Sequence, residues 1–291
     1  MKFFLRIFLL LLISSQALAQ NTETKKPLIV ASINPIYQII LAITADKSNN
    51  VLIISPSVSE HDYSFKKSDL KAVTKADLIF YVSDDLEKNF APLIKSQDKK
   101  LRAFELSKIN GLKLLQKRND VKKIDPHIWL NPQNAIKIAE FVAKKVAEID
   151  VKNSAQYYKN LEKFKKEVTA TDKIIKSQLS KIKGSDYVFF HDGYQYFENY
   201  FGLTSLKIIA SNHDQELGIK DLKEIDALAK QGSIKCIFGE KWDEKNTAQK
   251  LARNYKIKFI KLDLTGEKNA YPELLIKISD SVSACAGKAD K

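Results

Sequence analysis

The chain contains only four histidines, and each has an acidic residue within two positions. His61 lies in "SEHDYS", His127 in "DPHIW", His191 in "FFHDG" and His213 in "SNHDQ". Imidazole nitrogens and carboxylate oxygens are ligands that Zn²⁺ binds in a tetrahedral arrangement. A single histidine is more often a hydrogen-bonded or surface residue. The elements that carry these histidines therefore decide whether they form a metal site.

Short apolar runs alternate with longer amphipathic stretches, a pattern typical of an α/β fold with parallel sheets. Four runs lie in each half of the chain, which predicts two four-stranded lobes. The predicted strands are residues 28–33, 51–55, 77–82, 101–106, 187–191, 206–211, 235–240 and 258–264.

The stretch 133–183 between the two sets has no strand signal. Within it, apolar residues recur at steps of three, four and seven from Tyr157 to Ile182. This stripe predicts one amphipathic helix of about 25 residues, about 38 Å long, with Gly184 ending it. We expect an N-terminal lobe over 20–150, a linking helix over 151–183 and a C-terminal lobe over 184–291.

The histidines fall at the ends of these predicted elements. His61 follows a strand by a short loop, His191 ends a strand, and Asp263 lies near the end of another. His127 follows Pro126 and precedes a helix. Ligands of parallel sheets bind at the carboxyl ends of the strands, so these residues can meet in the cleft between two lobes. The acids beside the histidines either orient the imidazoles or cap helices.

The first nineteen residues have the pattern of a secretory signal peptide. Lys2 and Arg6 precede the apolar run "FLLLLI", and Ala17 and Ala19 give a small-residue cleavage site before Gln20. The apolar run is too short to span a membrane, and no cysteine stands near the cleavage point to carry a lipid. We expect an exported, periplasmic protein without a stable membrane anchor.

The chain is basic, with a formal net charge of +13 that becomes +11 without Lys2 and Arg6. The lysines alternate with acids along helical stretches, which indicates solvated faces and not a nucleic-acid surface. Cys236 and Cys285 are the only cysteines. In an oxidising compartment such a pair most simply forms one disulfide. We expect a monomer.

Several segments resemble the metal-binding cluster of ABC-transporter solute-binding proteins, and they are most similar to its periplasmic zinc-uptake (ZnuA) members. The resemblance covers nearly all of the chain after residue 19, in the same order. The segments that carry it are "EHDYSFKKSDLKAVTKADLIFYVSDDLE", "DPHIWLNPQNA", "VFFHDGYQYFENYFGL" and "LDLTG".

This resemblance implies a non-enzymatic protein that captures Zn²⁺ between two α/β lobes joined by a rigid helix. It would deliver the ion to the membrane permease of an ABC transporter. It carries metal-ligand roles onto His61, His127 and His191, and it matches Cys236 and Cys285 to positions that form a disulfide in the family.

The fourth ligand has three candidates: Asp263, Glu60 and a water molecule. Asp263 matches an acidic ligand position of several cluster members, and Glu60 matches the acid proposed for the zinc-uptake members. We favour Asp263, because it would come from the lobe opposite His61 and give each lobe two ligands. A short loop would have to strain to aim both Glu60 and His61 at one ion.

Two features depart from the zinc-uptake pattern. A lysine-rich stretch, residues 112–123, stands where relatives often carry a histidine- and acid-rich loop, and we expect it to be a solvated loop or helix end. His213 stands at no expected ligand position, and we interpret it as a surface or hinge residue.

Three alternatives stay open at this point. A manganese- or iron-binding member of the same family would have the same fold. An exported zinc-dependent hydrolase would need an activated water and a general base, with Glu60 or Glu240 as the nominal base, but no H-E-x-x-H motif is present. A basic adhesin would bind in a salt-sensitive, metal-independent way.

Overall fold

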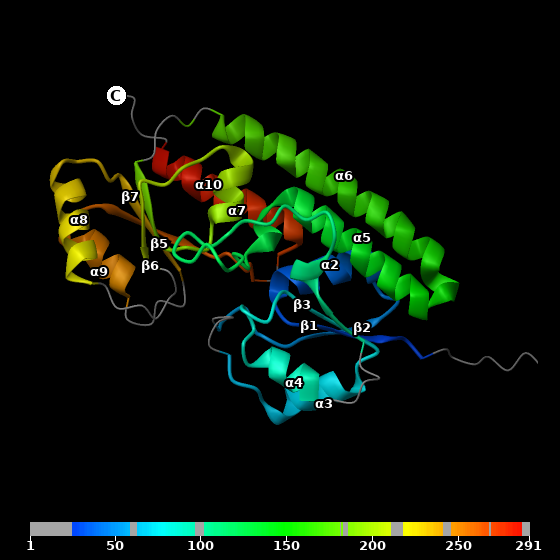
Figure 1. Cartoon of the computed structure of the whole chain (residues 1–291). Coiled ribbons are helices and arrows are strands. Elements are labelled where there is room, and N and C mark those ends of the chain that lie inside the picture. Colours follow the sequence, from blue (N-terminus) through cyan, green and yellow to red (C-terminus); the bar gives the residue numbers. More distant parts are fainter. Residues whose placement is uncertain are drawn as a thin grey trace, which may run out of the picture.

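A computed structural model describes residues 25–58, 63–96, 102–180, 182, 186–210, 218–240, 246–267 and 269–286 of the chain. Two four-stranded sheets, parallel throughout, lie in separate halves of the molecule (Figure 1). The first sheet has the order β2-β1-β3-β4 and the second the order β6-β5-β7-β8. The strands are β1 (Leu28–Ala31), β2 (Asn49–Leu52), β3 (Leu78–Tyr81), β4 (Ala103–Glu105), β5 (Tyr187–His191), β6 (Lys207–Ala210), β7 (Cys236–Glu240) and β8 (Lys258–Leu262).

These strands confirm the predicted fold class, and each of the eight lies in or overlaps a predicted run. Strands β3, β5 and β7 are buried along their whole length. Parallel strands covered on both faces have continuous apolar sequences of this kind. The second strand begins two residues earlier than predicted, because β1 pairs with Asn49 and Asn50.

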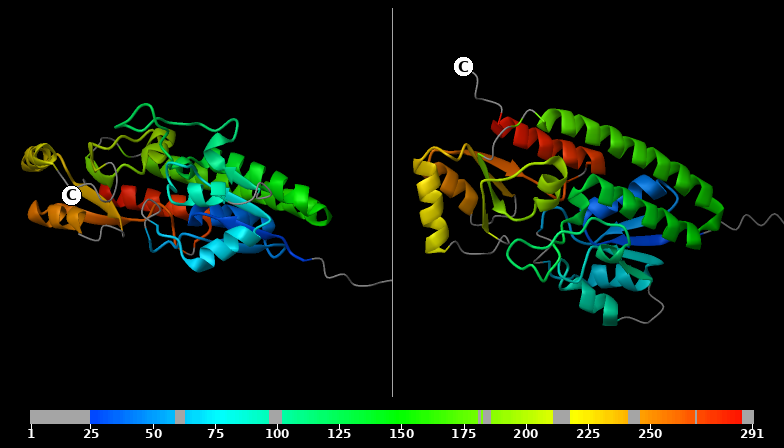
Figure 2. Two further views of the ribbon diagram at one scale, coloured as in Figure 1. Left: turned by 60° about the horizontal axis from the view of Figure 1, so that its bottom comes forward. Right: turned by 45° about the horizontal axis from the view of Figure 1, so that its top comes forward.

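Helices cover the faces of both sheets (Figures 1 and 2). Their bounds are α2 (Asn34–Thr44), α3 (Lys67–Lys75), α4 (Phe90–Ser96), α5 (Pro132–Ile149), α6 (Ser154–Leu179), α7 (Gln195–Phe201), α8 (Ile219–Lys230), α9 (Thr247–Asn254) and α10 (Tyr271–Ala286), with short 3₁₀ turns at Leu106–Lys108, Ile128–Leu130 and Val151–Asn153. None of the helices in the described part of the chain is long and apolar enough to cross a membrane.

Helix α6 is the long helix that the apolar stripe predicts. It has 26 residues and is therefore about 39 Å long. Its buried face carries Tyr157, Leu161, Phe164 and Val168 at helical spacing. The helix packs against α2 and α5 from the first half of the chain and against α10 from its end, and it runs along the outer side of these helices in Figure 2. It thus joins elements of both lobes along one face.

The apolar core is continuous between the lobes. One cluster of buried side chains includes Ile29 and Val30 of the first sheet as well as Tyr187 and Phe189 of the second. A separate, smaller cluster, which includes Val188, lies between the second sheet and helices α8 and α9. The larger cluster therefore joins the two lobes, which do not pack as independent units.

Cys236 and Cys285 form a disulfide, with their Cα atoms 5.8 Å apart. The bond ties the start of β7 to the last turn of α10, and both cysteines are buried. The predicted pairing is confirmed. It fixes the outer end of α10, while the first turn of that helix lies at the interface between the lobes.

We expect the double variant Cys236→Ser, Cys285→Ser to unfold at lower denaturant concentration than the parent. In the chain-entropy model, opening a loop of 49 residues removes about 4 kcal/mol from the free energy of unfolding. Urea titration measures the loss, and thiol labelling of the denatured, unreduced parent should detect no free sulfhydryl. Two labelled cysteines in the parent would disprove the bond.

Candidate metal centre

The second sheet places two functional side chains next to each other at the carboxyl ends of its central strands. His191 is the last residue of β5 and Glu240 the last residue of β7, and these strands are neighbours. Strand order reverses between them, which is where ligands bind in open parallel sheets. Nδ1 of His191 lies 3.1 Å from Oε1 of Glu240, and both side chains are almost completely buried.

His127 reaches the same place from the segment that precedes α5. It follows Pro126 directly and caps the 3₁₀ turn Ile128–Leu130. Oδ1 of Asp125 accepts a hydrogen bond from the backbone N–H of His127 at 3.0 Å and lies 2.7 Å from its Nδ1. The ring of His127 is centred 5.2 Å from that of His191. The structure thus brings together two of the three predicted histidines, although 64 residues separate them in the sequence.

The hydrogen bonds fix which nitrogen each ring presents. A carboxylate only accepts hydrogen bonds, so Nδ1 of each imidazole carries the proton. Nε2 is then the nitrogen with the lone pair that a metal ion needs. Burial, and then the charge of neighbouring His127, hold the pKa of His191 well below its usual range. The ring of His191 is therefore neutral at physiological pH, which is the form that binds metals.

Sequence reasoning did not pair Glu240 with His191 and named it only as a nominal base in the hydrolase alternative. We expected the acid next to His191, Asp192, as one candidate to orient the ring. Instead, Asp192 pairs with Arg118, and Glu240, 49 residues away, contacts Nδ1 of His191. The sequence did hold one indication of this contact, because Glu240 ends a predicted strand just as His191 does. Asp125, by contrast, orients His127 as the adjacent-acid pattern allowed.

Gly193 makes room for the close packing around His191. A Cβ atom at this position would lie 2.7 Å from Cδ2 of Leu264 and 2.9 Å from Nδ1 of His191. Both distances are too short for real contacts. A larger residue would displace the imidazole of His191 or the side chain of Leu264, so glycine at this position favours the observed packing.

Two of the predicted ligands, Glu60 and His61, lie outside the described residues, and so does His213. Within the described part of the chain, three or more histidine, cysteine or acidic side chains do not gather closely enough to hold an ion. The structure therefore supplies a pair of imidazoles, and the remaining ligands stay predictions.

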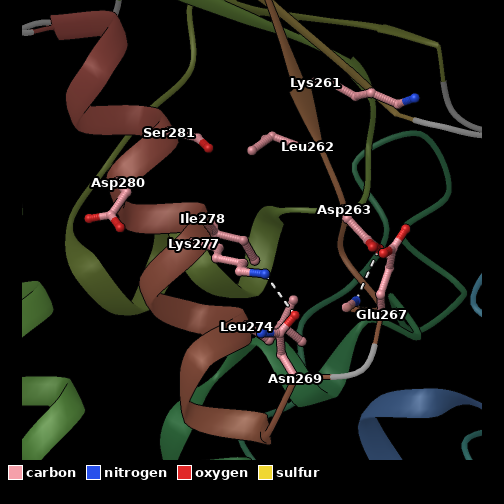
Figure 3. A pocket seen from close by; sticks show the side chains of 11 residues that line it. Lys261, Leu262, Asp263, Glu267, Asn269, Leu274, Lys277, Ile278, Asp280 and Ser281 are labelled. Carbon is pink, nitrogen blue, oxygen red and sulfur yellow. Dashed lines mark hydrogen bonds between the residues drawn. The ribbon is translucent and has the colours of Figure 1, made fainter.

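Asp263 lies directly after β8, close in sequence to Leu264. Its Oδ1 accepts hydrogen bonds at 3.0 Å from the backbone N–H groups of Thr265 and Gly266 and from the Thr265 hydroxyl. The residue also lines a hollow of about 500 Å³ between the end of β8 and α10. Figure 3 shows Asp263 beside Glu267 at one side of this hollow, and Lys277 donating to Asn269 further along. These bonds fix the orientation of Asp263.

A two-lobed α/β protein in which carboxylates orient a buried pair of imidazoles, one of them at a strand end, is typical of the solute-binding proteins that serve metal transporters. The family model described as "Zinc-uptake complex component A periplasmic", ZnuA, matches residues 29–285. The chain therefore belongs to the ZnuA family. It is a metal-binding, non-enzymatic substrate-binding protein of an ABC transporter, and its family consists of periplasmic or extracellular proteins that carry divalent metals.

Individual relatives differ in the metal that their names state. The chain is 25% identical to the high-affinity zinc uptake system protein ZnuA of Brucella suis, over 89% of this chain and 92% of that one. It is 29% identical to the manganese ABC transporter substrate-binding lipoprotein ScaA of Streptococcus gordonii, over 78% and 76%. The crystal structure of AdcAII from Streptococcus pneumoniae matches with a TM-score of 0.77 and 27% identity, over 90% and 98%. Similarity of this degree to both kinds of relative leaves the metal open.

We expect Glu240→Gln to lower the affinity for a divalent metal by about 10- to 100-fold, the range that is usual when a carboxylate partner of a metal-binding histidine is lost. The amide still accepts a hydrogen bond from Nδ1 but no longer supplies negative charge. Competitive titration against a chelator measures the change. Glu140→Gln, which alters a partly exposed acid paired with Lys165, is the matched control and should bind like the parent. Equal affinities for all three proteins would exclude the orienting role of Glu240.

Proposed function

We propose that the protein captures Zn²⁺ in the periplasm and delivers it to the membrane permease of its ABC transporter. The observation that supports this most is the buried pair His127–His191, in which carboxylates hold both Nδ1 atoms. Two preoriented imidazoles suit Zn²⁺, which favours nitrogen ligands, more than Mn²⁺, which favours oxygen. Manganese members of the cluster tend to have a carboxylate where this chain has His191.

In this proposal His61 is the third imidazole, and a carboxylate or water completes the tetrahedron. The ion is cargo, so the site must hold it without chemistry and then release it. Export, with removal of residues 1–19, and action as a monomer complete the proposed function. The signal peptide lies outside the described residues, and the basic N-terminal pattern supports it.

We expect the purified protein to bind one equivalent of zinc and to prefer it to manganese in direct competition. His127→Ala, His191→Ala and His61→Ala should each weaken zinc binding at least tenfold, because each removes a nitrogen ligand and not merely its support. Elemental analysis and chelator competition measure both points. A stronger preference for manganese would identify the protein as a manganese-binding member. Parent-like binding by all three variants would place the site elsewhere.

The fourth ligand gives a separate prediction. Asp263→Ala should reduce zinc affinity more than Glu60→Ala, because a carboxylate from the lobe opposite His61 would let the ion join both lobes while offsetting its charge. Both variants are measured at one pH against the same competing chelator. A larger effect of Glu60→Ala would place the acid beside His61, and two parent-like variants would leave water as the fourth ligand.

A further inference from the structure

Residues 115–125 form a basic hairpin that the proposed function has not yet used. The backbone N–H of Asp125 donates to the carbonyl of Leu115 at 2.8 Å, and that of Lys117 donates to the carbonyl of Lys123 at 2.9 Å. Gln116 and Ile124 form an antiparallel bridge. Most residues of this segment are exposed, so the expectation of a solvated loop holds, and these bonds close the loop into a hairpin. The segment is a folded hairpin that carries four cationic side chains.

The tip of this hairpin is bound to the second lobe through Arg118. One guanidinium nitrogen donates to Asp192, and the other donates to Oε2 of Glu198 in α7 at 2.6 Å. Arg118 is one-third exposed, whereas the two carboxylates are 10% and 3% exposed. Such a fork contacts two acids at once, which a single ammonium group does poorly.

The base of the hairpin is bound to the same lobe through Tyr196 of α7. The Tyr196 hydroxyl accepts from the backbone N–H of Leu115 at 3.0 Å and donates to the carbonyl of Asp125 at 2.9 Å. On the other side, Lys117 forms an ion pair with Asp85, which follows β3 of the first lobe. The hairpin therefore bridges the two lobes. In Figure 1 it is part of the teal segment that passes between the first sheet and β5.

Both anchors adjoin the histidine pair. Asp125, which ends the hairpin, holds Nδ1 of His127. Asp192, which binds Arg118, directly follows His191. If the tip of the hairpin lifts, the contact of Arg118 with Asp192, the neighbour of His191, breaks.

Movement of whole lobes is a poor route to the ion in this molecule. Trp129 donates from Nε1 to the carbonyl of Leu264 at 2.8 Å, and the Tyr271 hydroxyl donates to the carbonyl of Trp129 at 2.5 Å. Asn34 donates to the carbonyls of Thr265 and Gly266. These buried bonds join the lobes within one continuous core. The exposed tip of the hairpin, which is held by side-chain contacts, opens at much lower cost.

We propose that the hairpin 115–125 is a latch over the metal centre, and that the Arg118 fork to Asp192 and Glu198 sets the rate at which the ion leaves. This inference rests on the proposed function, because it regulates the same site. Arg118 acts as a positioning residue that does not contact the ion. Without its guanidinium, two buried carboxylates lack their cation, a costly arrangement that favours lifting of the hairpin.

The test compares zinc release from the parent, Arg118→Gln and Arg118→Lys. Lys122→Gln is the matched control, because Lys122 is an exposed cation of the same hairpin. Each protein is loaded with one equivalent of zinc and mixed with excess chelator at fixed ionic strength. We expect release about tenfold faster for Arg118→Gln, intermediate for Arg118→Lys and parent-like for Lys122→Gln. Hydrogen exchange in residues 112–125 should rise in the same order.

The sign of the change separates the latch from simple electrostatics. Removing a positive charge near a dication would by itself slow release, whereas opening a latch speeds it. Release at the parent rate or slower from Arg118→Gln would overturn the proposal.

The visible spectrum of the cobalt-loaded variants should match that of the parent, since the ligands are unchanged. An altered spectrum would show that Arg118 affects the ligands directly, which also overturns it. A parent that binds neither zinc nor manganese would instead refute the proposed function, and the parent titration reveals this separately.

Discussion

The structure depends on the bonds that Trp129 makes between the two lobes. Its indole donates to the chain just after β8, its carbonyl accepts from Tyr271 at the start of α10, and its ring packs against His127 with the ring centres 5.4 Å apart. Trp129 itself is fully buried. A donor left without a partner here would cost about 1–3 kcal/mol. The same residue thus positions one histidine and fixes the relative arrangement of the lobes.

The two sheets have equivalent strand orders. The strand order reverses between β5 and β7 in the second sheet, where His191 lies, and between β1 and β3 in the first sheet, where different residues lie. In the first sheet the corresponding place holds Ser32, after β1, and Glu87, beyond β3. The Ser32 hydroxyl donates to Glu87 at 2.5 Å, and the backbone N–H groups of Val82 and Ser83 donate to the same carboxyl. Burial raises the pKa of Glu87 to about 7. The carboxyl group there satisfies backbone donors and stabilises a turn, whereas Glu240 in the second sheet orients an imidazole. Equivalent positions in one topology thus serve different purposes.

The fold was predictable from sequence because its signals are local. Buried parallel strands are continuous apolar runs, and the buried face of α6 repeats at helical spacing. The strand Tyr187–His191 and the helix with the stripe from Tyr157 could therefore be predicted without tertiary information.

The site was predictable only in part. His127 and His191 stood at element ends, but the partner of His191 depends on which strand lies beside β5. That neighbour is β7, and this choice is a property of the sheet as a whole. The cross-lobe contacts of Arg118 were hidden for a similar reason. A lysine-rich stretch has the composition of a solvated loop, and only the position of α7 reveals buried acids facing it.

The overall charge of the chain opposes its proposed cargo, since a net charge of +13, or +11 without Lys2 and Arg6, repels a dication. At physiological ionic strength, charges further away than about 8 Å are largely screened, so the acids near the histidines matter more than the total. Four buried or nearly buried carboxylates lie in this region: Asp125, Glu240, Asp192 and Glu198. Two orient imidazoles, and the other two share the single positive charge of Arg118. If the hairpin lifts, Arg118 leaves and the negative charge around the site rises, which favours entry of a cation. When it closes, a positive charge returns to the boundary of the site. The contact of Arg118 with Asp192 and Glu198 thus sets the local charge at the site. This local charge, and not the net charge of the chain, then decides whether an ion enters or stays.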